Sequence, residues 1–145
     1  MGKRSYVINV DGVVYRDDQY LLIERGSAEQ HASGELAFPG GTVEADPFEQ
    51  EVLTDTVRRE VFEEVGITIT DPEFIHSNTF EIDDHTLCLN VVMLCSHAGG
   101  DAHVRGGDEV AAIHWRTYDE IVADDDVPQF TQRFADIAEE ARTQN

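Results

Sequence analysis

The chain has 145 residues, 41% of them hydrophobic, which suits one domain with a hydrophobic core and excludes an intrinsically disordered protein. The formal net charge of −20 excludes a general affinity for nucleic acid or for an anionic membrane surface. No apolar run is long enough to span a membrane, and the N-terminus lacks the apolar region of a secretory signal. We therefore expect a single domain over residues 1–145 of a cytoplasmic protein.

The acidity itself points to the environment of the protein. Lys3 is the only lysine, beside nine arginines and 30 acidic residues. Such a surface fits a halophilic, high-salt cytoplasm, where screening relieves the self-repulsion of the charges. Most carboxylates are then expected to have no specific role. Cys88 and Cys95 fall in one apolar stretch and are expected to be buried thiols, with a disulfide as the less favoured alternative.

The first third of the chain predicts strands. Residues Tyr6 to Tyr15 are rich in Val, Ile and Tyr, and Tyr20 to Glu24 continues them after a polar turn, so we expect a hairpin. A polar loop from Gly26 to Glu35 then leads to the pair Gly40-Gly41.

A helix is expected next. Asp46-Pro47 is typical of a helix start and Gly66 of a helix stop, because proline suits the first helical position and glycine the left-handed residue beyond the end. The sequence between them predicts about four to five helical turns.

The rest of the chain predicts alternating strands and two further helices, which indicates an α+β domain with helices packed on a mixed sheet. Thr86 to Ser96 is the most continuous apolar run and is expected to be buried on both faces. Thr117 is expected to cap a short helix, and Pro128 to open a last one ending near Arg142. Further strands are expected at Ile67–Ile69, Phe74–Ile82 and Val110–Trp115.

Near the end of the central helix, Glu60, Glu63 and Glu64 share one face, because residues three and four apart are neighbours on a helix. They also lie at the negative end of the helix dipole, where anions are unfavourable. A divalent cation, Mg²⁺ or Mn²⁺, would relieve this repulsion and retain open positions for water and phosphate. The alternative is a solvated acidic face on a very acidic protein.

The surrounding residues favour the metal. The pattern Arg59-Glu60-Val61-x-Glu63-Glu64-x-Gly66-Ile67, after a Gly-Gly loop, resembles the Nudix box of the Nudix hydrolases. Glu51 lies eight residues before Arg59, as the first glutamate of the box does. Four residues are inserted between Gly41 and Glu51, which either lengthens the helix by about one turn or lengthens the loop before it. The resemblance implies the α/β/α sandwich of the Nudix fold.

The resemblance also implies a reaction, the hydrolysis of a diphosphate bond in a nucleoside diphosphate derivative with Mg²⁺ or Mn²⁺ as cofactor. It implies that Glu63 and Glu64 are metal ligands, that Glu60 is a ligand or the base, and that the Gly40 carbonyl is a further ligand. Arg59 would pair with Glu51 and fix the helix; a simple pair with Glu63 is the alternative.

The general base is left open by the box. Some family members use a glutamate from a later loop, and Glu109 stands just before the Trp115 strand, where such a residue would come. We therefore expect Glu109 to assist as a base or as a metal ligand, with an ordinary acid in an acidic loop as the alternative.

Substrate choice is weakly encoded. Arg25 and His31 fall where Nudix hydrolases that act on nucleotides contact phosphate or base, although a surface Arg and a loop His are equally compatible. In a nucleoside triphosphatase, Phe80 or Phe130 would stack on the base and Gln129 or Asn78 would bond its edge. The two phenylalanines are alternatively part of the core.

The favoured function is thus a Mg²⁺-dependent pyrophosphohydrolase whose partner is a free nucleotide, such as a (deoxy)nucleoside triphosphate. The alternatives within the family are a nucleotide-sugar, ADP-ribose or dinucleotide pyrophosphatase, or a regulatory module that binds nucleotide without turnover. A salt-tolerant acidic domain that binds cations loosely is the third reading. The sequence does not decide between a monomer and a homodimer.

Overall fold

A computed structural model describes residues 3–26 and 34–144. Its elements in chain order are β1 (Ser5–Arg16), β2 (Gln19–Arg25), β3 (Leu36–Ala37), β4 (Gly40–Thr42), α1 (Val52–Val65), β5 (Thr68–Glu81), β6 (Thr86–Gly99), β7 (Val110–Thr117), α2 (Tyr118–Ala123) and α3 (Gln129–Thr143). None of the helices in this part of the chain is long and apolar enough to cross a membrane.

The strands form one mixed sheet in the order β3-β2-β1-β6-β5, with β4 also paired to β1 and β7 to β2. The pair β1–β6 is parallel, and the other described pairs are antiparallel. β1 pairs with β2 only at the end next to their turn, at Tyr15↔Tyr20 and Arg16↔Gln19. Further back along β1, β4 takes the neighbouring position, at Asn9 to Asp11. The sheet therefore opens between β1 and β2.

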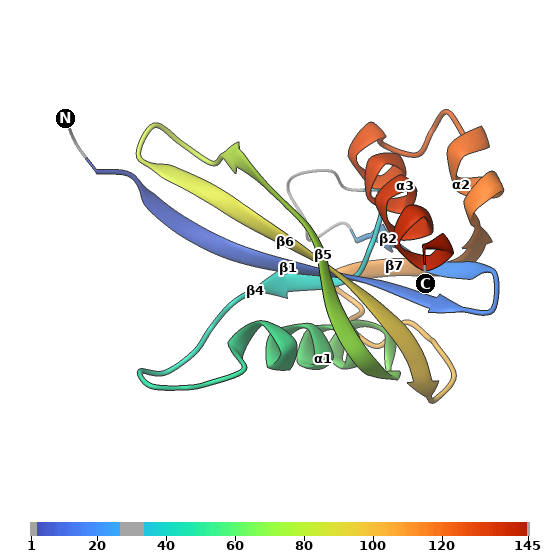
Figure 1. Cartoon of the computed structure of the whole chain (residues 1–145), viewed down its shortest axis with the longest axis horizontal. Helices are drawn as coiled ribbons and strands as arrows, with labels where there is room; N and C mark the ends of the chain where they lie inside the picture. Colours follow the sequence, from blue (N-terminus) through green and yellow to red (C-terminus); the bar gives the residue numbers. More distant parts are fainter. Residues whose placement is uncertain (1–2, 27–33, 145) are drawn as a thin grey trace.

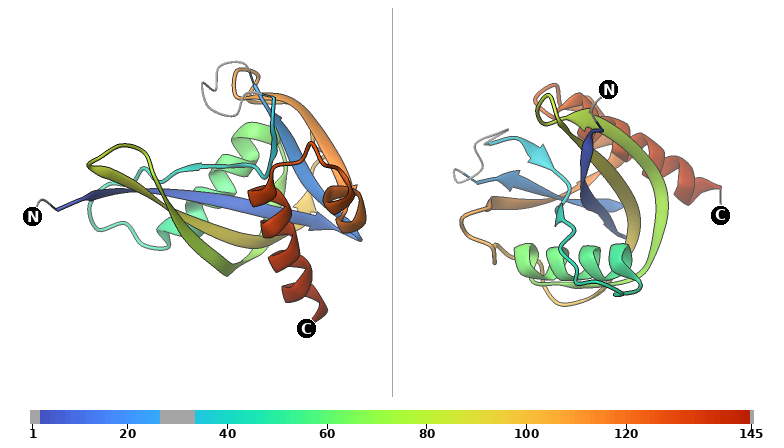
Figure 2. Two further views of the ribbon diagram at one scale, coloured as in Figure 1. Left: turned by 90° about the horizontal axis from the view of Figure 1, so that it is seen from above. Right: turned by 90° about the vertical axis from the view of Figure 1, so that its left-hand side faces the viewer.

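Helices cover both faces of the sheet, with α1 on one side and α2 and α3 on the other (Figures 1 and 2). Alternation along β1 divides its side chains between the two sides, so that Val10 and Val14 pack toward α1 while Val13 packs toward α3. From α1, Val57, Val61 and Val65 join the first of these cores. The predicted α+β sandwich with a mixed sheet is confirmed.

The predicted start of α1 at Asp46-Pro47 is wrong. The helix begins at Val52, and residues 46–51 form a lead-in loop. Phe48 and Glu51 have φ angles of 70° and 56°, which lie in the left-handed region and cannot belong to a right-handed helix. The four inserted residues thus lengthen the loop and not the helix. The predicted end at Gly66 is confirmed, with φ 74° and its amide bonded to the Phe62 carbonyl.

The prediction of two strands at Ile67–Ile69 and Phe74–Ile82 is also wrong in detail, because β5 is one strand. The pairing with β6 shifts register between Thr70 and Glu73, where Asp71 has a φ angle of 52°. This is a β-bulge, which accommodates Pro72 and lets the strand continue. β6 is buried on both faces over the run from Asn90 to Cys95, within the stretch for which burial is predicted.

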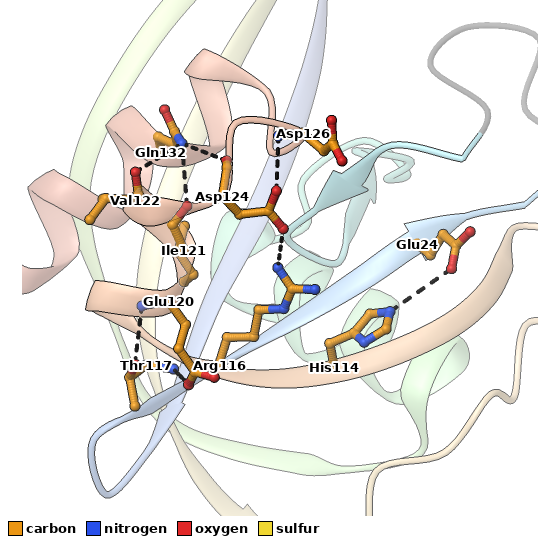
Figure 3. Close-up of polar contacts among 10 residues, drawn as sticks. All are labelled: Glu24, His114, Arg116, Thr117, Glu120, Ile121, Val122, Asp124, Asp126 and Gln132. Atoms are coloured by element: carbon orange, nitrogen blue, oxygen red, sulfur yellow. Dashed lines mark hydrogen bonds and ion pairs between the residues drawn. The ribbon is translucent and has the colours of Figure 1, made fainter.

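Polar contacts fix the corner between β7, α2 and α3 (Figure 3). Thr117 caps α2 as predicted: its hydroxyl accepts from the Glu120 amide, and the Glu120 carboxylate accepts from the Thr117 amide. Arg116 pairs with Asp124 at 2.8 Å, just beyond α2. From α3, the Gln132 amide group donates to the Asp124 carbonyl. These contacts hold the short helix against the longer one.

Cys88 and Cys95 are free thiols buried in β6, which confirms the favoured prediction. Burial raises the pKa of Cys95 to about 12. Its thiol packs in the core on the α1 side of the sheet.

Candidate active site

A pocket of about 300 Å³ lies where β1 and β2 diverge, between the Gly-Gly strand β4 and the second half of α1. It is lined by residues from both sides of this opening: Asn9, Asp11, Ile23, Arg25, Phe38, Gly40, Gly41, Thr42, Glu44, Glu60, Glu64 and Glu109. Five of these side chains are carboxylic acids, and one, Arg25, is a cation. The lining is therefore strongly negative unless protons or cations compensate for it.

Glu64 is the most deeply placed of these acids. It is 4% exposed, and its buried Oε2 atom has no hydrogen-bond partner among the described residues. Burial, followed by the negative charges of Glu60 and Glu109, raises the pKa of Glu64 to about 8, although a hydrogen bond from the Gly40 backbone opposes the shift. A buried acceptor oxygen with no donor needs either a proton or a cation.

Glu60 lies one turn earlier on α1, directly against Gly41. A β-carbon added to Gly41 would come within 2.5 Å of Glu60 Oε2, so only glycine allows the carboxylate this position. Burial, followed by the charge of Glu63, raises the pKa of Glu60, and a hydrogen bond from Arg59 opposes the shift. The Gly-Gly pair thus brings the β4 backbone close to the acidic face of the helix.

Arg59 pairs with Glu60 at 3.4 Å and with Glu63 at 3.9 Å. The described contacts of Arg59 do not include Glu51, which is exposed at the start of α1. The left-handed conformation of Glu51 explains this difference from the expected pairing. Because α1 begins only after Glu51, no additional N-terminal turn carries this residue on the helix. Glu63 has a side chain that is 54% exposed and does not line the pocket.

The segment from Asp101 to Glu109 brings Glu109 to the pocket by running along the end of α1. The amides of His103, Arg105 and Gly106 donate to carbonyls of the last turn, at 3.0 to 3.1 Å. The carbonyl of Glu109 accepts from the Gly26 amide at the end of β2. Glu109 is therefore anchored both to the helix that carries Glu60 and Glu64 and to the strand that carries Arg25.

A polar network that includes Asn9 and Asp11 forms another wall, and the sequence analysis singled out neither these two residues nor Asn90. The Asn9 side chain donates to Asp11 at 3.0 Å and to Asn90 at 2.8 Å, and Asn90 donates to Asn78 at 3.3 Å. Burial raises the pKa of Asp11 to about 6. Asn9 and Asp11 interrupt an otherwise apolar strand at alternate positions, and this pattern is the signal that would have found them.

The residues predicted to bind substrate are not all at the pocket. Arg25 lines it, whereas His31 lies outside the described residues. Phe80, 53% exposed on β5, and Phe130, 46% exposed at the start of α3, are not among the lining residues, and neither is Gln129. Contact of these three with a base stays a prediction.

A model of the NUDIX domain matches residues 5–136 of the chain. The chain belongs to the NUDIX family. The 8-oxo-dGTP diphosphatase of Escherichia coli K12 is 31% identical over 78 residues, which are 54% of this chain and 57% of that protein. The match thus spans little more than half the length of this curated relative.

The NUDIX fold is equally clear from solved structures. The MutT protein of Methanosarcina mazei Go1 superposes with a TM-score of 0.79 over 98% of this chain and 99% of that one, at 23% identity. The MutT NUDIX hydrolase of Burkholderia pseudomallei gives a TM-score of 0.76 over 92% and 98% of the two chains, at 21% identity. At sequence identities this low, the structural similarity shows a shared fold and nothing more.

The fit of a metal to this NUDIX site rests on its donor set. Within residues 3–26 and 34–144, no three His, Cys, Asp or Glu side chains are grouped closely enough to form a ready cation site. The pocket nevertheless offers hard oxygen donors from Glu60, Glu64 and Glu109, and Glu64 Oε2 has no partner in the part of the chain that the structure describes. Carboxylate oxygens are the ligands that Mg²⁺ and Mn²⁺ prefer, so the residues suit such an ion.

Proposed function

We propose that the chain is a Mg²⁺- or Mn²⁺-dependent hydrolase that cleaves a diphosphate bond in a nucleoside triphosphate. The observation that carries this proposal is the pocket in which Glu60, Glu64 and Glu109 converge beside a single arginine. A diphosphate is itself anionic and would be repelled by these carboxylates. The pocket suits such a substrate only when cations lie between the two sets of negative charge.

In this proposal, Glu60 and Glu64 hold the metal, with the Gly40 carbonyl and Glu63 as further oxygen ligands. When bound, the divalent ion would neutralise phosphate charge and lower the pKa of the attacking water. Glu109 is the general base, placed at the pocket by its anchored segment, and Arg25 contacts a phosphate oxygen. Arg59 acts indirectly, by holding the carboxylates of Glu60 and Glu63 through its ion pairs.

The substrate class rests on two kinds of support. The curated relative acts on a nucleoside triphosphate, as its name says, and Asn9 and Asp11 give the pocket a hydrogen-bonding wall that could meet a base or sugar. Stacking of the base on Phe80 or Phe130, with Gln129 at its edge, remains part of the proposal.

The test is product release from a panel of nucleoside triphosphates, ADP-ribose, nucleotide sugars and dinucleotides, with and without Mg²⁺, at low and high salt. The expected result is Mg²⁺-dependent release of pyrophosphate from a triphosphate. Glu64→Gln should lower kcat/KM about 100-fold or more, since charge stabilisation by a bound metal is worth several kcal/mol. Glu73→Gln, an exposed carboxylate on β5, is the matched control.

Three results would contradict the proposal in whole or in part. Absence of turnover on the whole panel would remove the enzymatic function, and full activity of Glu64→Gln would remove this pocket as its site. Cleavage of dinucleotides or ADP-ribose alone would reject the triphosphate and leave a different diphosphate substrate in its place.

A further inference from the structure

Arg105 lies outside the pocket, yet each of its described contacts goes to the last turn of α1. Its guanidinium carbon lies 4.6 Å from the centroid of the Phe62 ring, and Nη1 donates to the Glu63 carbonyl at 3.4 Å. Its backbone amide donates to the Glu64 carbonyl at 3.0 Å. One exposed residue thus contacts three consecutive residues of α1.

These contacts compensate for unpaired carbonyl groups and negative charge at the C-terminal end of α1. The last carbonyls of a helix have no partner within it and carry the negative end of its dipole. At the end of α1 this negative end adds to the repulsion among the carboxylates of Glu60, Glu63 and Glu64. The last turn of α1 contains no basic residue of its own, so Arg105 brings a cation to it from another segment.

The same contacts fix the position of Glu109. The turn after Arg105 is closed by bonds from the amides of Glu109 and Val110 to the Gly106 carbonyl, both at 2.9 Å. Gly106 is in turn bonded to Glu64. A displacement of Arg105 from α1 would therefore be transmitted through four residues to Glu109.

We propose that Arg105 is a positioning residue of the hydrolase: it clamps the segment 101–109 onto the last turn of α1 and so sets Glu109 against the same pocket as Glu64. This role rests on the proposed function and adds a residue to it. The guanidinium stacks as a plane on Phe62 while donating sideways to a carbonyl, a combination that lysine cannot reproduce.

The experiment is a double-mutant cycle on kcat and KM with Arg105→Ala, Glu109→Gln and the double variant. Arg105→Ala should lower kcat about 10-fold and change KM little, because it misplaces the base without touching substrate. In the Glu109→Gln background the same substitution should lower kcat less than about twofold, because the group it positions is already gone. The kcat of Arg105→Lys should be close to that of Arg105→Ala.

Arg133→Ala is the matched control, because it removes the same charge from an exposed position on α3. Amide hydrogen exchange provides a readout independent of turnover: exchange at His103 and Gly106 should be faster in Arg105→Ala and unchanged in Arg133→Ala. The wild type is measured beside every variant.

The outcomes separate this inference from the proposed function. An inactive wild type would reject the hydrolase itself. With an active wild type, the inference is overturned if the kcat of Arg105→Ala equals that of Arg133→Ala, or if Glu109→Gln retains a normal kcat. It is also overturned if Arg105→Ala lowers kcat by the same factor in the wild-type and Glu109→Gln backgrounds. Full rescue by Arg105→Lys would show that charge alone matters, which also overturns the clamp.

Discussion

The Glu60 carboxylate occupies the space that a side chain on Gly41 would need, because a β-carbon there would lie 2.5 Å from Glu60 Oε2. We predict that Gly41→Ala displaces this carboxylate and lowers kcat/KM about 10- to 100-fold, since misplacement by about 1 Å can cost about 100-fold. The loss should be seen in steady-state kinetics, with a far-ultraviolet circular dichroism spectrum like that of the wild type.

Gly107→Ala is the control for that substitution. No atom of the described residues lies within 4 Å of the β-carbon it would add, so activity should be retained. Equal losses in the two variants would mean that the contact between Glu60 and Gly41 has no special importance.

The raised pKa of Glu64 predicts how stability depends on pH. Between its ordinary value of 4.5 and about 8, the folded protein holds a proton on Glu64 that the unfolded chain has released. The free energy of unfolding of the metal-free protein should therefore fall as pH rises through this window, by about 1.4 kcal/mol per pH unit from this group. Asp11, with a pKa of about 6, adds a fall of the same sign at lower pH.

Urea denaturation of the metal-free protein at pH 5, 6, 7 and 8 measures this dependence. Glu64→Gln should show a shallower decline, because its amide carries no proton to lose, and Glu73→Gln should follow the wild type. A wild-type stability that rises with pH in this range would contradict the prediction.

Metal binding should release protons. If Mg²⁺ binds Glu64, it displaces the proton that this group holds at pH 7, so up to about one proton should leave for each ion bound. Calorimetric titration with Mg²⁺ in buffers of different ionisation enthalpy measures that number. The released fraction should approach zero at pH 9 and in Glu64→Gln, and a release that does not depend on pH would exclude Glu64 as the ligand.

The capping box of α2 should contribute about 1 kcal/mol to stability, the typical value for an N-cap side chain. Thr117→Ala removes the hydroxyl that accepts from the Glu120 amide at 3.2 Å and should lower the free energy of unfolding by that amount. Thr117→Ser keeps the hydroxyl and should lose much less. Equal losses in the two variants would assign the effect to packing of the methyl group.

Features with a local cause were predictable from the sequence. Gly66 ends α1 because glycine tolerates the left-handed conformation, and Thr117 caps α2 because its hydroxyl reaches a free amide two or three residues on. The spacing of Glu60 and Glu64 likewise determines that both share one helix face.

Features that depend on unusual backbone or on distant segments were not predictable. Phe48 and Glu51 adopt left-handed conformations that their residue types do not indicate, and Asp71 adopts one that aspartate tolerates without requiring it. The start of α1 and the bulge in β5 were therefore missed. The pocket joins β1, β2, β4, α1 and the Glu109 segment, and only the folded chain shows that Asn9 and Asp11 line it.

The thiol of Cys95 can report how often the core between α1 and the sheet opens. With a pKa of about 12 and no exposed surface, it offers almost no thiolate to an alkylating reagent while α1 covers this face of the sheet. Alkylation at that sulfur therefore requires α1 to separate from the sheet, and its rate measures how often this happens. The slow modification of Cys95 would report the opening of this core without any added label.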